Sequence, residues 1–431
     1  MKVNLAYGRT GLAVELPDDR TTVVEPAYTP GADDPAAVLR AALRHPVAGP
    51  RLRDIVRPGN TVAVAVCDGT RAQPRRLMVP AVLEELEGIV DLADVVVLVA
   101  TGTHRGNTHQ ELREMLGDEV VDRVRVVNHD ARDGASLTWM GRHGNDVPVW
   151  LNRMWVESDV RVTTGFVEPH FFAGFSGGPK LAVPGLAGLE TVLTLHDAAR
   201  IGDPNATWAV CEGNPVHDDV RAVVGAVGGV HFGFDVTLNR EQEIVGAFAG
   251  DLFAMHAAAR EAAREIATRP VPQRYDVVVT TNSGYPLDQN LYQAIKGISA
   301  AALVVKDGGT IICAAECRDG FPDHGSYRQV LASAESPQAL LESIEGAPTT
   351  VPDQWQVQVQ AKVQTRARVV MHTSYLSDEA LSEAHMEQTA DIGAEVARLL
   401  AELGPEARVC VLPEGPQTIP LVETGAGLAR T

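Results

Sequence analysis

The stretch that decides the fold is residues 61–100, TVAVAVCDGTRAQPRRLMVPAVLEELEGIVDLADVVVLVA. It begins with an apolar, β-branched run from Thr61 to Val66 and ends with another from Val95 to Ala100. Between the two runs, apolar residues recur at helical spacing over residues 77–94. A strand, a helix and a second strand in this order are typical of a parallel sheet with helices on its faces. The stretch therefore predicts an α/β fold.

The same alternation continues along the chain in two sets. The first set adds strands over residues 124–127 and 160–164, and it ends with a helical stretch over 251–269 and the breaker segment PVPQR. The second set has strands over residues 275–280, 310–315, 367–371 and 408–412, separated by helices over 336–346 and 386–403. We predict two α/β domains with mostly parallel sheets and a cleft between them. The N-terminal domain spans residues 1–270 and the C-terminal domain residues 271–431, with residues 415–431 as a candidate to pack back on the first domain.

Composition excludes several classes of protein. A chain of 431 residues is too long for one ordinary core. The net charge of 37 − 56 = −19 repels phosphodiester backbones and anionic lipid, so we expect no nucleic-acid partner. The sequence has no apolar run long enough for a membrane span, and its first residues lack the features of a signal peptide, so we expect a cytoplasmic protein with no membrane partner. The five cysteines have no CxxC spacing and are interpreted as reduced, buried thiols.

The most informative segment is residues 168–188, EPHFFAGFSGGPKLAVPGLAG, which we call the glycine-rich loop. Glycines allow backbone N–H groups to approach a ligand, commonly a phosphate. A nucleotide P-loop is disfavoured because Pro179 precedes Lys180 and Leu181 follows it. Only five of the 37 basic residues are lysines, at positions 2, 180, 296, 306 and 362. A plain glycine-rich turn does not explain one of these rare lysines beside a histidine.

Three histidines stand at predicted strand ends or just after the glycine-rich loop. They are His104 in TGTHR, His170 in EPHFF and His196 in TVLTLHDAAR. Each one alone is more often a hydrogen-bonded structural residue, but three in such positions favour a functional role. They are not spaced as zinc ligands on one helix. The other histidines, His217 and His256 among them, are interpreted as ordinary.

Basic groups that could hold a carboxylate come next. Arg71, in DGTR, follows the first strand, where a planar guanidinium could bind a carboxylate through two hydrogen bonds. A loop salt bridge explains Arg71 equally well. Gln293 and Lys296 are three residues apart in NLYQAIKG and share one face of a predicted helix.

These motifs occur in one order over most of the chain: DGTR (68–71), TGTHR (101–105), EPHFFAGFSGGPKLAVPG (168–185), His196, NLYQAIKG (290–297) and DQWQVQ (353–358). With them the sequence resembles the nickel-dependent lactate racemases and their 2-hydroxy-acid racemase and epimerase relatives. The resemblance implies two α/β domains around a cleft and an isomerase that acts on a lactate-like 2-hydroxy acid. It also implies two kinds of partner, a 2-hydroxy carboxylate substrate and the enzymes that build the cofactor and insert nickel. The oligomeric state is left open.

The resemblance further implies a cofactor and roles for individual residues. The cofactor is a nickel pincer nucleotide, a pyridinium-3-thioamide-5-thiocarboxylic acid mononucleotide attached covalently to Lys180. The implied roles are His196 as the nickel ligand; Asp68, Ser176, Gly177 and Gly178 at the cofactor; His104 and His170 as the acid and base; Arg71, Gln293 and Lys296 at the substrate carboxylate; and Tyr292 and Trp355 near the substrate.

The residue types agree with a hydride-transfer racemisation. A C–H bond beside a hydroxyl and an ionised carboxylate is too weakly acidic for an imidazole to deprotonate easily. Hydride removal by the cofactor avoids that carbanion and gives a planar 2-keto acid, and two histidines then serve the hydroxyls of the two enantiomers. One alternative is a nicotinamide-type 2-hydroxy-acid dehydrogenase, although no GxGxxG follows the early strands. Another is a non-catalytic binder of a phosphorylated metabolite.

Overall fold

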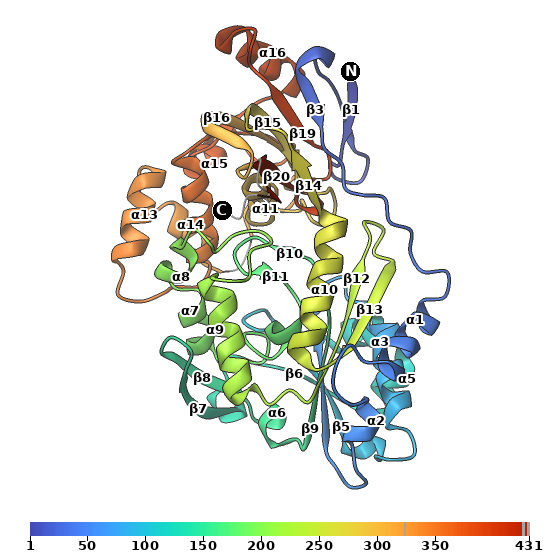
Figure 1. The fold of residues 1–431 in the computed structure, drawn as a ribbon. Helices are drawn as coiled ribbons and strands as arrows, with labels where there is room; N and C mark the ends of the chain where they lie inside the picture. Colours follow the sequence, from blue (N-terminus) through green and yellow to red (C-terminus); the bar gives the residue numbers. More distant parts are fainter. Residues whose placement is uncertain (323–324, 425–426, 429–431) are drawn as a thin grey trace. The chain divides into compact units, whose positions relative to one another are not determined.

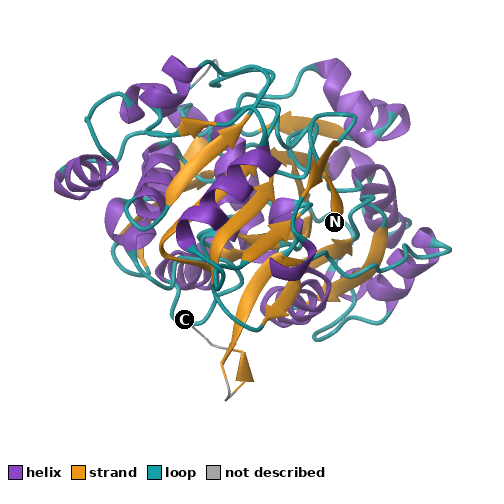
Figure 2. Cartoon of the chain, turned by 90° about the horizontal axis from the view of Figure 1, so that it is seen from above, coloured by secondary structure: helices purple, strands orange, loops and turns teal. Residues whose placement is uncertain are grey.

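The computed structural model describes residues 1–322, 325–424 and 427–428. The chain forms two compact units, each considered by itself (Figure 1). The central unit comprises Tyr28–His196 and Ala209–Ile266, and the terminal unit comprises Met1–Ala27, Asp197–Trp208 and Ala267–Thr431. Strands and helices alternate along the chain in both units, which confirms the predicted α/β class. Figure 2 shows the strands together with the helices beside them.

The central unit is built on a six-stranded sheet of order β13-β12-β9-β4-β5-β6. All neighbours are parallel except β12 and β13, which are antiparallel. The strands are β4 (Val62–Cys67), β5 (Val95–Ala100), β6 (Arg125–Asn128), β9 (Val160–Phe166), β12 (Phe232–Leu238) and β13 (Ile244–Gly250).

Both faces of this sheet are covered, which explains why its strands read as continuous apolar runs. Val62, Val64 and Val66 point to one core, whereas Ala63 and Ala65 point to the other, because successive side chains of a strand alternate between faces. Helices α1 (Pro35–Arg44), α2 (Leu52–Ile55), α3 (Arg75–Leu86) and α4 (His109–Leu116) contribute to the first core. Strand β8 (Val147–Asn152) and helices α6 (Arg153–Glu157), α7 (Leu189–Leu195), α9 (Pro215–Val223) and α10 (Leu252–Ala267) contribute to the second.

The strand order places three loops of the central unit side by side. From β4 the chain continues to β5 and β6 on one side, whereas β9, β12 and β13 lie on the other. Ligands of open α/β sheets bind at the carboxyl ends of the strands where the order reverses in this way. The loops that leave β9, β4 and β5 at this point carry His170, Arg71 and His104, respectively.

The terminal unit contains a second six-stranded sheet, of order β18-β17-β16-β15-β19-β3, in which all neighbours are parallel. Its strands are β3 (Thr21–Val23), β15 (Tyr275–Thr281), β16 (Val305–Ala314), β17 (Arg368–His372), β18 (Glu387–Gln388) and β19 (Val409–Leu412). The hairpin of β1 (Lys2–Leu5) and β2 (Leu12–Glu15) and helix α16 (Ile392–Leu403) share one core with this sheet. The unit also contains α11 (Leu291–Ala301), α12 (Tyr327–Leu331), α13 (Pro337–Gly346), α14 (Gln354–Gln364) and α15 (Asp378–Glu383).

The observed units differ from the predicted division at residue 270 in two segments. Residues 1–27 belong to the terminal unit because β3 pairs with β19 and the β1–β2 hairpin enters its core. Residues 197–208 belong there as well, because the Gln358 amide donates to the Ala198 carbonyl and the Trp208 indole to the Ser299 hydroxyl, at 2.8 and 3.1 Å.

The C-terminal segment also differs from the prediction. Strand β20 (Ile419–Thr424) pairs in parallel with β14 (Thr268–Val271), and both lie in the terminal unit. The described part of residues 415–431 thus joins the terminal unit rather than the N-terminal domain, and residues 425–426 and 429–431 lie outside the described part. The five cysteines are buried thiols, as predicted. Among the described residues, no helix is both long and apolar enough to cross a membrane.

Candidate active site

Asp68 and His104 form a hydrogen-bonded pair at the ends of β4 and β5. The His104 Nδ1 lies 2.8 Å from the Asp68 Oδ2, and the Thr70 hydroxyl donates to the other carboxylate oxygen at 2.8 Å. Burial opposes ionisation of Asp68, but the hydrogen bond and charge of His104, the charge of Arg71 and the Thr70 hydroxyl bring its pKa below the usual value. An ionised carboxylate only accepts, so Nδ1 carries the proton and Nε2 of neutral His104 presents its lone pair.

Arg71 lies in a turn after β4 that is held by hydrogen bonds. Its N–H donates to the Asp68 carbonyl at 3.2 Å, and its own carbonyl accepts from both terminal nitrogens of Arg75 at 3.1 Å. Arg75 is buried at the start of α3. These hydrogen bonds fix the backbone from which the Arg71 guanidinium extends. The sequence interpretation did not single out Arg75. Its position four residues after Arg71 was the signal that could have identified it.

His170 lies in a short hairpin within the glycine-rich loop, where β10 (Pro169–His170) pairs with β11 (Gly174–Phe175). The backbone N–H of Ala173 donates to the His170 Nδ1 at 3.3 Å, and that of Phe172 lies at 3.5 Å. Since Nδ1 accepts, the neutral imidazole carries its proton on Nε2. His170 therefore has the opposite tautomer to His104.

His196 ends α7 and is buried. Its Nδ1 lies 2.7 Å from the Val192 carbonyl, which can only accept, so the lone pair resides on Nε2. Burial, with a smaller contribution from the charge of Lys180, lowers the pKa of His196 to about 4. A neutral imidazole whose other nitrogen is fixed by a backbone carbonyl is the usual form of a metal-binding histidine.

Lys180 lies in a short 3₁₀ helix, Gly178–Leu181, in the middle of the glycine-rich loop. Burial, followed by the positive charge of Arg71, lowers the pKa of Lys180 to about 7. A substantial fraction of this lysine is therefore a neutral amine near neutral pH, the form that can make a covalent bond to carbon.

One ring that the sequence interpretation did not single out contacts three of the candidate residues. The buried Phe172 ring lies 4.5 Å from the His170 ring and 5.2 Å from the His196 ring, centroid to centroid, both edge-on. The Lys180 Nζ lies 5.6 Å from its centroid. The available signal was the pair of phenylalanines directly after His170.

Ser176, Gly177 and Gly178 form the bend before Lys180. The Ser176 hydroxyl donates to the Phe166 carbonyl at 3.1 Å and accepts from the Glu168 N–H at 3.0 Å, so it closes the loop onto the end of β9. Both glycines have positive φ, +72° and +52°. The assigned contacts of these three residues with a cofactor stay a prediction.

The remaining predicted residues lie in the terminal unit. Tyr292, Gln293 and Lys296 occupy the first turns of α11, which follows the carboxyl end of β15, and Trp355 is the second residue of α14. The Gln356 amide donates to the Tyr292 carbonyl at 2.5 Å and links the two helices. The structure therefore groups Asp68, Arg71, His104, His170, Lys180 and His196 in the central unit and these four residues in the terminal unit. The predicted cleft between the domains stays a prediction.

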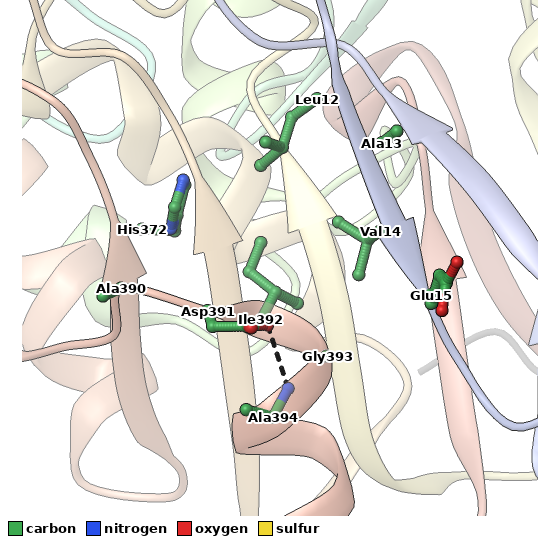
Figure 3. Close-up of a pocket in the computed structure, with 10 residues that line it drawn as sticks. All are labelled: Leu12, Ala13, Val14, Glu15, His372, Ala390, Asp391, Ile392, Gly393 and Ala394. Carbon is green, nitrogen blue, oxygen red and sulfur yellow. Dashed lines mark hydrogen bonds between the residues drawn. The ribbon is translucent and has the colours of Figure 1, made fainter.

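A surface hollow elsewhere in the terminal unit contains none of these residues (Figure 3). It measures about 540 Å³ and is lined by residues 12–15, His372 and residues 390–394. The Asp391 side chain faces the start of α16, where it accepts from the Ala394 N–H at 3.0 Å. Within the described ranges, no cluster of three or more His, Cys, Asp or Glu side chains could hold a metal ion. A metal site made of protein ligands alone is therefore not found there.

An open α/β sheet that presents a lysine, two histidines and an arginine on loops at its switch point is an arrangement typical of α/β enzymes. The lactate racemase N-terminal domain matches residues 7–209 and the lactate racemase C-terminal domain matches residues 271–419. The chain belongs to the lactate racemase family and is an isomerase.

Two curated relatives match over nearly their whole length. The lactate racemase of Thermoanaerobacterium thermosaccharolyticum is 34% identical over 423 residues, 97% of this chain and 98% of the relative. The lactate racemase of Lactiplantibacillus plantarum is 31% identical over 418 residues, 96% of this chain and 98% of the relative.

Solved structures agree at the level of the fold. The lactate racemase apoprotein from T. thermosaccharolyticum matches with a TM-score of 0.92 and 32% identity, over 98% of this chain and all of that one. A crystal structure of a protein from Thermotoga maritima matches with a TM-score of 0.65 and 18% identity, over 92% of this chain and all of that one, and shares the fold.

Proposed function

We propose that this enzyme racemises lactate or a lactate-like 2-hydroxy acid with a nickel pincer nucleotide attached to Lys180. The observation that carries the proposal is the arrangement around Phe172, where a lysine of lowered pKa and a neutral, backbone-fixed histidine lie on the same ring. The family relationship supports a 2-hydroxy acid as the substrate.

The residues present fit the proposed cofactor. Lys180 can provide a neutral amine for the covalent attachment, and His196 can offer its Nε2 lone pair to nickel. When bound, the nickel pincer nucleotide would supply the centre that accepts hydride from the substrate carbon and returns it. The cofactor-building and nickel-inserting enzymes are the proposed protein partners. The proposed contacts of Asp68, Ser176, Gly177 and Gly178 with the cofactor complete this assignment.

The side chains themselves would bind the substrate and move its hydroxyl proton. Arg71, Gln293 and Lys296 are the proposed carboxylate-binding groups, and Tyr292 and Trp355 the proposed contacts near the substrate. His104 would accept the hydroxyl proton at Nε2, because Asp68 fixes the proton of the neutral ring on Nδ1 and stabilises the imidazolium that forms. His170, whose Nδ1 accepts the Ala173 N–H, presents Nε2–H as a hydrogen-bond donor to the substrate, and it would transfer a proton only from its imidazolium form. The loops that carry the two histidines follow β5 and β9, on either side of β4. We propose that each histidine serves one enantiomer.

The decisive experiment combines mass, metal and activity. The protein is produced together with the cofactor-building enzymes, and the intact mass, the nickel content and the conversion of L-lactate to D-lactate are measured. We expect an adduct on Lys180, about one nickel per chain and racemisation. Lys180→Arg should abolish all three, whereas Lys362→Arg should keep them, because Lys362 is another half-buried lysine that donates to the Ile201 and Gly202 carbonyls instead. Wild-type protein with neither adduct nor nickel would contradict the proposal.

The two-histidine assignment has its own test. His104→Asn and His170→Asn should each keep the adduct and the nickel but stop racemisation. Full racemisation by either variant would refute that assignment. A panel of 2-hydroxy acids with longer side chains then identifies the preferred substrate.

A further inference from the structure

Two buried titratable side chains that have no part in the proposed chemistry lie directly beneath the glycine-rich loop. Asp235 projects from β12 and His256 from α10, and they are 0% and 1% exposed. Burying a carboxylate and an imidazole costs free energy unless each is hydrogen-bonded. Their partners are therefore informative, and each side chain has a backbone partner in this loop.

The two side chains hold the backbone on either side of Gly177. The Gly178 N–H donates to the Asp235 Oδ2 at 2.6 Å. The His256 Nε2 lies 2.9 Å from the Ser176 carbonyl, which can only accept, so Nε2 is the donor. One side chain thus binds the carbonyl before Gly177 and the other binds the N–H after it.

The glycines fit this arrangement because no other residue has room there. A Cβ on Gly177 would lie 2.8 Å from the Asp235 Oδ2, and a Cβ on Gly178 would lie 2.4 Å from the His256 ring. In the sequence, the glycines of this loop indicated backbone N–H groups that can approach a ligand such as a phosphate. In the structure the Gly178 N–H is directed inward to Asp235.

The position of Lys180 depends on this bend. Its N–H donates to the Gly177 carbonyl at 3.1 Å, and its carbonyl accepts from the Gly185 N–H at 3.0 Å. Any rotation of the Ser176–Gly178 backbone would turn the first residues of the 3₁₀ helix and with them the Lys180 side chain.

We infer that Asp235 and His256 are positioning residues that hold Lys180 in the orientation needed for covalent attachment of the cofactor. The inference rests on the proposed function for the identity of the attached group. The hydrogen bonds that form the bend are observed in the structure and do not depend on that function. Asp235 stays buried beside Gly178 and Gly165, and burial raises its pKa to about 7 against the effect of these two N–H groups. A neutral carboxyl keeps an oxygen that accepts from Gly178, so the side-chain amide introduced by Asp235→Asn should replace it.

The test uses paired variants of the full chain. Asp235→Ala and His256→Phe remove the hydrogen bond, whereas Asp235→Asn keeps an acceptor and His256→Gln keeps a donor. Asp288→Ala is the matched control, because Asp288 is equally buried and accepts backbone N–H groups of Gly8 and Glu316 in the terminal unit, at 2.7 and 3.0 Å. The rate of adduct formation on Lys180 and the hydrogen exchange of the Gly178 amide in the apoprotein are measured for each.

We expect Asp235→Ala and His256→Phe to slow attachment about tenfold or more and to accelerate exchange of the Gly178 amide by a similar factor. The Asn and Gln variants should stay within about threefold of wild type, and Asp288→Ala should attach at the wild-type rate despite a comparable loss of stability.

Attachment at the wild-type rate in folded Asp235→Ala and His256→Phe would overturn the inference. Equal defects in Asp288→Ala, or in the Asn and Gln variants, would overturn it too, because general destabilisation would then explain them. If an alanine or phenylalanine variant fails to fold, the conservative pair and the exchange measurement decide. Failure of the proposed function looks different: wild-type protein would carry no adduct, while the exchange comparison would still report on the bend.

Discussion

The three candidate histidines of the central unit have ring nitrogens whose roles are set by the backbone or by a carboxylate. The acceptors at Nδ1 of His104 and His196 leave a lone pair on Nε2, whereas the donors at Nδ1 of His170 leave a proton there. The same residue type can therefore present a lone pair at one position and a hydrogen-bond donor at another. The partner atom, and not the histidine itself, determines which.

The Asp68–His104 pair gives the first prediction. In Asp68→Asn, the amide nitrogen can face Nδ1 of His104 and move the ring proton to Nε2, the atom that must accept. We expect kcat to fall roughly 10²- to 10⁴-fold. Thr70→Val is the control, because it removes only the hydrogen bond to the other carboxylate oxygen and should cost less than about tenfold. Racemisation kinetics and intact mass are measured together, and loss of the Lys180 adduct in Asp68→Asn would show that Asp68 acts on cofactor attachment and not mainly through His104.

The lowered pKa of Lys180 gives the second prediction. A lysine reacts with an amine-directed reagent only when neutral, so its reactivity should rise with pH through a midpoint near 7 in the apoprotein. Pulse labelling with trinitrobenzenesulfonate from about pH 5 to 11, resolved by peptide mass, measures this midpoint. Arg71→Gln removes the second cause of the shift and should move the midpoint upward. A wild-type midpoint near 10, the ordinary value of a lysine side chain, would contradict the prediction.

At the scale of elements, most strands that the sequence predicts are buried on both faces, whereas β6, which was predicted as well, is partly exposed. β4, β5, β9 and β15 are continuous β-branched runs because both of their faces lie in a core. The pair β12–β13 was not predicted. It contains a charged residue, Asp235, and several glycines, which weaken the pattern of a strand. The Asp235 carboxylate in a run of apolar residues was a signal that this segment has a special role, since a buried charge requires a partner.

The residues of the candidate site also differ in whether the sequence alone could reveal them. Lys180, His170 and Arg71 stood out because each is a rare or functional residue type next to a strand end or a glycine. Phe172 and His256 did not stand out, because their roles depend on contacts with residues elsewhere in the chain. The spacing of neighbouring residues does not reveal such contacts. His256 meets Ser176 across 80 residues of chain. Side chains that support a site from a different element become visible only when the sheet order is known.

The bend before Lys180 gives the third prediction, at the scale of the loop. Gly178→Ala would place a Cβ 2.4 Å from the His256 ring at a φ of +52°, so we expect a loss of about 3 kcal/mol in the free energy of unfolding. Gly346→Ala is the matched control, because Gly346 ends α13 with no atom within 4 Å of the added Cβ and no positive φ. It should be neutral or stabilising by up to about 1 kcal/mol. Urea unfolding measures both, and equal effects would contradict the steric argument.

At the scale of the whole molecule, charge and function are distributed unequally. The chain carries a net charge of −19, yet among the titratable candidate residues of the central unit only Asp68 is acidic, and the others are Arg71, Lys180 and three histidines. An anionic substrate and a phosphorylated cofactor would be repelled by the average surface, so local positive charge is needed where they bind. The remaining basic candidate, Lys296, lies in the terminal unit.

This distribution predicts that cofactor attachment and substrate binding can be separated by mutation. Lys296→Met removes a cation on α11 without changing any residue of the central unit, where the attachment residues lie. We expect the Lys180 adduct and the nickel content to match wild type, while KM for lactate rises about 10- to 100-fold, the loss expected for one hydrogen bond to a charged group. Lys306→Met is the matched control: Lys306 is a half-exposed lysine of the same unit that pairs with Asp276 at 2.8 Å, and its loss should leave KM unchanged. A variant that loses the adduct would show that Lys296 acts on attachment, and an unchanged KM would remove Lys296 from the substrate site.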